Sequence, residues 1–214
     1  MSPVVQACQT HLIPLEESTP GMIAQIRNNV ISQVVALACK ELNMPADKLI
    51  VRDIMPYTDL GFDYGAASTG TAENWEHDMT GTTVGYTTVT GDATMADQRY
   101  VALFGARDLR FAQGATSQGV TDRLVNAELQ GGVSFIKFSV GGATKALWDF
   151  TCAQAYKQAM VAFSPSAVII PQNAAYNIYF YQKNIAAVAT AKSIPVYIQL
   201  IGVTVEPRGK VISP

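Results

Sequence analysis

Hydrophobic and polar residues alternate with a period of two in the C-terminal part of the chain. In Val133–Val140, Ile136 and Phe138 fall on one side of an extended chain and Phe135 and Lys137 on the other, and Tyr176–Tyr181 repeats the pattern. This alternation of aromatic and β-branched residues predicts strands. The segment 194–207 (IPVYIQLIGVTVEP) predicts another strand. We therefore expect the last eighty residues to form an all-β half.

Two prolines refine this prediction. We expect Pro171 and Pro195 to lie at strand margins, where the missing N–H costs no ladder hydrogen bond.

A helical period stands out near the N-terminus. Thr19 precedes Pro20, which is a favoured pairing of N-cap and first-turn residues. The chain then carries apolar residues at steps of three and four: Ile23, Ile26, Val30, Val34 and Leu37. This spacing predicts an amphipathic helix that ends near Asn43, before Pro45. Core packing is the preferred role for its apolar stripe, and binding of a membrane or a partner is the alternative.

The middle of the chain predicts two strands separated by a long loop region. Lys48–Met55 predicts a strand that stops at Pro56, and Gln98–Phe104 predicts another. Between them, residues 57–97 hold six Gly and ten Thr and predict a largely irregular region with one strand or hairpin around Thr82–Thr90. The mixed pattern of Ala146–Phe163 is interpreted as a second short helix.

These elements define a mainly β fold class, an antiparallel sandwich with one N-terminal amphipathic helix. The predicted domains are an N-terminal arm and helix (1–45) and a single β-sandwich domain (46–214) that contains the acidic loop region 57–97. The predicted core includes nine residues: Phe135, Phe138, Trp148, Ile178, Phe180, Val196, Ile198, Leu200 and Val203.

The composition is apolar and poor in charge. Hydrophobic residues make up 49% of the chain and charged residues 15%, whereas about 25% charged is usual for a soluble domain. A partner subunit that covers part of the surface would explain this, and so would a dense β-rich core. No apolar run approaches the roughly 20 residues of a membrane span. The N-terminus does not resemble a signal peptide. Three dispersed cysteines do not suggest a disulfide framework, so we expect synthesis in a reducing cytoplasm.

Charge is unevenly distributed along the chain. Residues 53–97 hold eight acids and no Lys or Arg, whereas residues 98–214 hold five acids and eleven bases. Opposite patches of this kind favour head-to-tail subunit contacts, although an acidic loop on a neutral protein is the simpler interpretation. The predicted contact residues are Asp59, Asp63, Arg107, Arg110, Arg208 and Lys210. Glu206 and Arg208 close the last strand, as an anchor between subunits or as a surface ion pair.

Motifs for catalysis, metals and phosphate are lacking in the sequence. There is no Gly-x-Ser-x-Gly, no Cys-x-x-Cys, no His-x-x-x-His and no phosphate-binding glycine pattern. His77 lies between Glu76 and Asp78 in the expected loop, where a solvated histidine is the preferred interpretation. Asp59 and Asp63 could hold calcium but lack the alternating acids of an EF-hand. We therefore assign no catalytic, cofactor or metal residue, and no nucleic-acid motif.

The segments FIKFSVGG, AVIIPQNAAYNIYFY and IPVYIQLIGVTVEPRG carry a resemblance. In strand length, proline placement and Tyr/Asn/Gln-rich joints they resemble the jelly-roll coat (capsid) proteins of icosahedral tailless viruses, of the internal-membrane phage and archaeal virus type. The resemblance implies an eight-stranded sandwich of two sheets. It also implies a non-enzymatic virion protein that needs no cofactor. Its partners would be itself and other capsid proteins, with an internal membrane or the genome in indirect contact. The N-terminal helix departs from a minimal jelly roll.

Two other functions remain open. A jelly-roll carbohydrate- or receptor-binding module could use loop 57–97, with aromatic residues stacking on sugars and Asp59 and Asp63 binding hydroxyls or calcium. A small hydrolase or isomerase could use His77 with an acid. The leading hypothesis is a structural virion protein that self-assembles into an icosahedral capsid.

Overall fold

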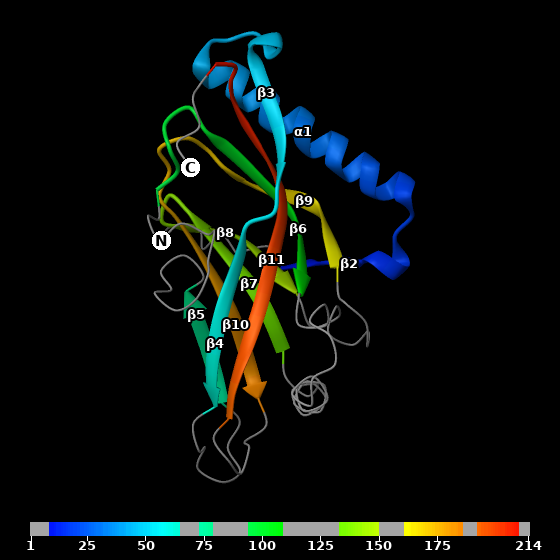
Figure 1. Cartoon of the computed structure of the whole chain (residues 1–214), viewed down its shortest axis with the longest axis vertical. Coiled ribbons are helices and arrows are strands. Elements are labelled where there is room, and N and C mark those ends of the chain that lie inside the picture. The colour runs from blue at the N-terminus through cyan, green and yellow to red at the C-terminus, as the bar shows by residue number, and fades with distance from the viewer. Residues whose placement is uncertain are drawn as a thin grey trace, which may run out of the picture.

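The computed structural model describes residues 9–64, 73–78, 94–108, 133–149, 161–185 and 192–209. In these residues the protein is mainly β, with two sheets of largely antiparallel strands and one long N-terminal α-helix (Figure 1). This agrees with the predicted fold class at that level.

The first sheet, sheet A, contains five strands in the order β1-β8-β7-β10-β5. Its neighbours pair antiparallel except for the short parallel pair β1·β8. In that order, the strands are β1 Gln9–His11, β8 Ala143–Asp149, β7 Val133–Val140, β10 Tyr176–Ile185 and β5 Glu73–Asp78.

The second sheet, sheet B, has the order β2-β9-β6-β11-β3, and β4 also pairs with β11. Its strands are β2 Ile13–Pro14, β9 Val161–Ile170, β6 Tyr100–Asp108, β11 Lys192–Pro207, β3 Leu49–Ile54 and β4 Tyr57–Tyr64. The long strand β11 is shared, because Gly202–Pro207 pairs with β3 and Lys192–Gln199 with β4. Between these two parts the backbone N–H of Leu200 donates to the Pro56 carbonyl at 2.7 Å.

The antiparallel pairs are nested along the chain. Strand β7 pairs with β8, β6 with β9, β5 with β10, and the β3/β4 segment with β11. The first strand of the series therefore pairs with the last, the second with the last but one, and so on inward. Two further pairs, β11·β6 and β10·β7, join these hairpin arms into the two sheets.

Helix α1 (Pro20–Leu42) covers the outer face of sheet B. Its ends match the prediction. The Thr19 side chain accepts a hydrogen bond from the Met22 N–H at 3.2 Å, and Asn43 adopts the left-handed conformation (φ 52°) that ends the helix. The side chains of Val30, Val34 and Ala38 are buried and pack in a cluster with residues of sheet B. The helix is thus part of the packed core. Two short 3-10 helices flank it, Leu15–Glu17 and Ala46–Lys48.

A second hydrophobic cluster lies between the two sheets. At its centre the rings of Phe138 and Trp148 meet edge to face, with centroids 4.5 Å apart. The alternation predicted for Val133–Val140 is confirmed where burial is described, because Ile136, Phe138 and Val140 are buried and the residues between them are not. Of the predicted core residues, the structure buries Phe138, Trp148, Ile178, Ile198, Leu200 and Val203.

The other three predicted core residues have different outcomes. Phe135 is half-buried on the other face of β7, and the side chains of Phe180 and Val196 lie outside the described set. Val203 packs under α1, whereas Ile198 and Leu200 pack between the sheets.

Several local predictions were wrong. Two stretches of the expected loop 57–97 are strands, because β4 pairs with the N-terminal half of β11 and β5 pairs with β10. Both ends of the expected short helix Ala146–Phe163 lie in strands β8 and β9. Pro171 does follow a strand, but Pro195 lies inside β11, where β4 is the only described partner.

The strand expected at Thr82–Thr90, like the middle of the expected second helix, lies outside the described residues. Among the residues that are described, no helix is long and apolar enough to span a membrane.

Candidate functional site

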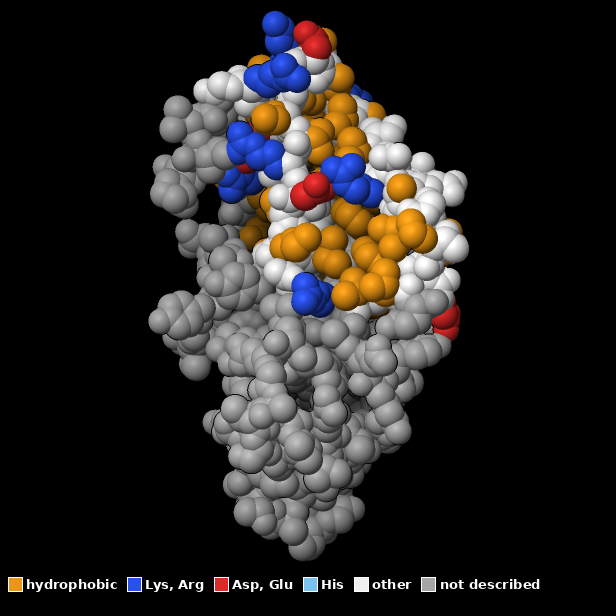
Figure 2. All heavy atoms as spheres, turned by 45° about the vertical axis from the view of Figure 1, so that its right-hand side comes forward, with side chains coloured by type: hydrophobic (Ala, Val, Ile, Leu, Met, Phe, Trp, Pro, Cys, Tyr) orange, Lys and Arg blue, Asp and Glu red, His pale blue; other side chains and the backbone are white. Residues whose placement is uncertain are grey.

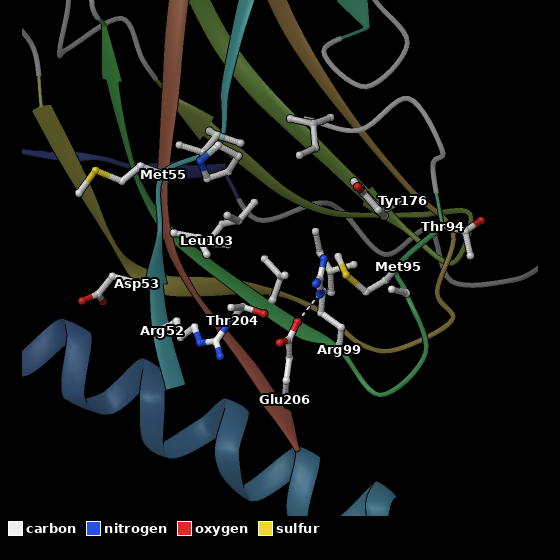
Figure 3. Close-up of a pocket in the computed structure, with 17 residues that line it drawn as sticks. Arg52, Asp53, Met55, Thr94, Met95, Arg99, Leu103, Tyr176, Thr204 and Glu206 are labelled. Atoms are coloured by element: carbon white, nitrogen blue, oxygen red, sulfur yellow. Dashed lines mark hydrogen bonds and ion pairs between the residues drawn. The ribbon is translucent and has the colours of Figure 1, made fainter. Parts of the chain in front are cut away.

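A cleft of about 610 Å³ opens between the two sheets, near the β3 edge (Figure 3). We call it the intersheet cleft. Its walls come from β3, β6, β9 and β11 of sheet B, from β10 of sheet A, and from the segment that precedes β6. Apolar side chains form much of the lining: Val101, Leu103, Ile170, Ile178 and Leu200. The volume falls within the roughly 300–1,000 Å³ typical of small-molecule sites.

Polar side chains form a strip along the sheet B wall of the cleft. In the β3·β11 register Arg52 lies opposite Thr204, and in the β6·β11 register Val101 lies on the other side of Thr204. Residues directly opposite each other in a sheet share a face. Figure 3 shows Arg52, Thr204, Glu206 and Arg99 along this wall. The strip therefore combines two guanidinium groups, a hydroxyl and a carboxylate.

Glu206 is the most deeply buried charge in the strip. It is 2% exposed, and its Oε1 accepts a hydrogen bond from the Nε of Arg99 (Figure 3). A carboxylate is costly to bury without a partner. The side chain of Arg99 is 35% exposed, so it connects the buried carboxylate with the solvent side of the cleft.

Two other polar groups in the strip lack partners within the described part of the chain. The Oγ1 atom of Thr204 is buried and forms no hydrogen bond there, and the residue is 9% exposed. Arg52 forms neither a hydrogen bond nor an ion pair with another described residue. Its neighbour Asp53 is bound instead by Arg27 of α1, through contacts of 3.0 and 3.1 Å. A buried hydroxyl and a free guanidinium thus face the same cavity.

The segment before β6 closes one side of the cleft. Met95 exchanges backbone hydrogen bonds with the turn after β9: its N–H donates to the Ala174 carbonyl at 2.9 Å, and its carbonyl accepts from the Asn173 N–H at 3.0 Å. The Asn173 side chain donates to Asp97 at 3.1 Å. These contacts hold the buried Met95 side chain in the cleft wall.

The structure does not gather the predicted contact residues at one place. Arg107 lies in β6 opposite Gln199, and its Nε is buried without a hydrogen-bond partner among the described residues. Arg208 follows the end of β11, nine residues after Gln199, a separation of about 30 Å along a strand. Asp59 and Asp63 lie in β4, opposite Tyr197 and Ser193 of β11. Arg110 and Lys210 lie outside the described residues.

The interpretation of Glu206 and Arg208 as a surface ion pair was wrong, whereas an anchor between subunits stays a prediction. Glu206 points into the cleft and pairs with Arg99. Arg208 is exposed, and its Nε donates to the Leu49 carbonyl at 3.2 Å, while its backbone N–H donates to the Lys48 carbonyl at 2.7 Å. Arg208 therefore fastens the end of β11 to the start of β3.

The residues considered for calcium binding and catalysis also lie in strands. Asp59 and Asp63 belong to β4, and His77 lies in β5 opposite Phe180, so none of them lies in the expected loop. No group of three or more potential metal ligands occurs in the described ranges.

Sequence reasoning missed Arg52, Arg99 and Thr204. The available signal was the alternation in the last strand, which places Thr204 and Glu206 on the same face as Leu200.

Comparison with known proteins does not assign the chain to a family. No protein-family model matches it, and no curated protein matches it at a significant level. The function is therefore inferred from the strand topology, the surface and the intersheet cleft.

Proposed function

We propose that this chain is a structural virion protein, a jelly-roll coat subunit that self-assembles into an icosahedral capsid with copies of itself and other capsid proteins. The observation that carries the proposal is the nested strand pairing. A jelly roll is a long antiparallel hairpin of four paired arms rolled into two sheets. If the four nested strand pairs of this chain are rolled up in this way, one sheet has the strand order β3/β4-β11-β6-β9 and the other has the order β5-β10-β7-β8. Both strand orders occur in the two sheets of this protein. The short strands β1 and β2 extend the sheets at the other edge.

The surface favours a subunit that is covered in an assembly. Only 15% of the residues are charged. Figure 2 shows hydrophobic side chains gathered in a band over α1 and the neighbouring part of sheet B, with charged groups both within it and along its side. Leu15, Met22 and Met55 are large hydrophobic residues that are exposed, with Met55 56% exposed. Extended apolar patches commonly mark protein interaction sites.

The separated charged residues suit contacts with different neighbours. In a closed shell each subunit meets several copies through interfaces that each bury roughly 1,200–2,000 Å². Arg107 and Arg208, about 30 Å apart along β11, could not serve a single small contact. We assign them, with Arg110 and Lys210, to separate basic contacts, and Asp59 and Asp63 to the acidic side.

The alternative binding module has less support. It required a loop of aromatic and acidic residues, but Tyr57, Asp59 and Asp63 lie in β4 and Trp75 lies in β5. The hydrolase hypothesis used His77 with an acid, and His77 lies in β5. Neither hypothesis gains a specific observation, so the coat subunit is our single proposal.

A charge placed on the apolar band tests the proposal. Met22→Glu changes an exposed side chain in the first turn of α1 and should leave the fold intact, while it puts a carboxylate into the proposed subunit contact. Lys145→Glu, at an exposed position of β8 in the other sheet, is the matched control. We expect the wild type and the control to form multi-subunit particles by light scattering and negative-stain imaging, and Met22→Glu to remain small. Assembly of all three proteins would exclude the band as a contact, and a monomeric wild type would refute the function.

A further inference from the structure

The intersheet cleft has no role in the proposed coat function. A structural sandwich is most stable when its interior is filled, as it is around Phe138 and Trp148. Beside this packed region the structure keeps a cleft of about 610 Å³, partly open to solvent, and lines it partly with charged residues. Apolar side chains left in contact with water and buried polar groups without partners both cost stability. A bound molecule would offset both costs.

The apolar part of the lining defines one half of such a molecule. Leu103, Ile170, Ile178 and Leu200 come from both sheets and face the same space. They offer no hydrogen bonds, so they suit an alkyl chain or an apolar ring system.

The polar strip defines the other half. Arg99 is neutralised by Glu206, and Asp53 is bound by Arg27, so these four side chains carry no net charge. Arg52 remains as the charged side chain of the lining without a partner among the described residues. Beside it, the buried Thr204 hydroxyl has no partner among the described residues and can donate one hydrogen bond. One guanidinium and one hydroxyl match the two oxygens of a single carboxylate.

We propose that the intersheet cleft binds an amphipathic monocarboxylate, a molecule of the fatty-acid type. Its apolar body lies between the two sheets, and its carboxylate accepts hydrogen bonds from Arg52 and Thr204. A neutral apolar molecule would leave Thr204 unpaired. A dianionic headgroup would face the carboxylate of Glu206, which disfavours it. This site does not depend on assembly, so it stands or falls separately from the coat function.

The test is a binding titration of the full chain with cis-parinaric acid, a fluorescent polyene fatty acid. Hexadecanoate is then used as the competitor, and hexadecan-1-ol is the uncharged analogue with the same chain. A short-chain phosphatidylcholine, kept below its micelle concentration so that the probe has no bilayer to enter, serves as a third arm and distinguishes a free carboxylate from a phospholipid. We expect saturable binding of one probe per chain. Hexadecanoate should displace the probe at a concentration at least tenfold lower than hexadecan-1-ol requires, and the phospholipid should not displace it.

Variants locate the site. Arg52→Ala should weaken probe binding at least tenfold, Arg52→Lys should restore part of it by keeping the charge, and Thr204→Val should weaken it severalfold. Lys145→Ala removes an exposed cation of β8, which β7 separates from the cleft-lining strand β10, and should bind like wild type. Near-UV circular dichroism shows whether each variant is folded, and the Arg52→Lys and Thr204→Val variants retain the test if Arg52→Ala does not fold.

Three results would overturn the proposal. In the first, the wild type shows no saturable binding of the probe. In the second, folded Arg52→Ala binds the probe as tightly as Lys145→Ala does. In the third, hexadecan-1-ol displaces the probe as well as hexadecanoate does.

Discussion

Replacing Arg99 by methionine would leave the Glu206 carboxylate buried without its cationic partner. Glu206 is 2% exposed and its Oε1 accepts from the Nε of Arg99. Removing one member of a buried pair costs about 3–5 kcal/mol, because the remaining charge stays desolvated. The side chain of Arg99 is 35% exposed, and some water can follow its removal. We therefore expect Arg99→Met to lower the free energy of unfolding by about 3 kcal/mol, the low end of that range.

Substitution of the other member of the ion pair should lower the free energy of unfolding by less. Glu206→Gln removes the buried charge and leaves Arg99, which can turn toward solvent. We expect it to destabilise by about 1–2 kcal/mol, the cost of a lost charge-assisted hydrogen bond. The double variant Arg99→Met/Glu206→Gln should be more stable than Arg99→Met alone, since it contains no buried charge.

Urea unfolding of the wild type, the two single variants and the double variant measures the free energies of this double-mutant cycle. All are compared at one protein concentration, because self-association would shift apparent stability by mass action. The reasoning fails if Arg99→Met costs less than about 1 kcal/mol, or if Glu206→Gln costs as much as Arg99→Met. Either result would mean that the Glu206 carboxylate is solvated or has another partner.

Two further predictions concern the two faces of sheet B. Burial, together with the hydrogen bond to Glu41 at 2.9 Å and its negative charge, raises the pKa of Tyr100 well above the usual value near 10. The stability that this shift contributes is fully present below about pH 10 and is lost as pH rises above it. Urea unfolding at pH 8 and pH 11 measures this loss. Between these pH values the free energy of unfolding should fall by about 1.4 kcal/mol more in wild type than in Tyr100→Phe. Gly202→Ala should destabilise by about 1–3 kcal/mol, because its Cβ would lie 2.5 Å from the Ala102 carbonyl oxygen and 2.9 Å from Leu103 Cδ2. Thermal unfolding would check this, and an unchanged midpoint would show that β11 and β6 can separate without cost.

Local features of the fold could be predicted from the sequence. Helix α1 depends on a cap, an apolar stripe and a C-terminal residue that lie within 25 positions, so the range from Thr19 to Asn43 gave the correct limits. The alternation in β7 was equally local.

Strand β4 could not be predicted in the same way. The sequence YTDLGFDY contains Asp and Gly, which are poor strand formers. It forms a strand because β11 pairs with it from more than 120 positions away. Such pairing depends on tertiary contact, which no local pattern contains.

The cleft shows the same limit. Alternation puts Thr204 and Glu206 on the face of Leu200, but it does not say which residues lie opposite them. Arg52 is 152 positions before Thr204, and Arg99 is 107 before Glu206. Glu206 was therefore paired with its near neighbour Arg208, whereas the fold gives it Arg99.

Under the proposed function, copies of this chain assemble into a closed shell. The most direct measurement is the native mass of the purified full chain at low and high salt, by sedimentation velocity, with negative-stain imaging of the same samples. The coat function predicts rings, capsomers or shells of defined size that loosen as salt rises, because acidic and basic contacts are screened. A monomer at every protein and salt concentration would contradict it.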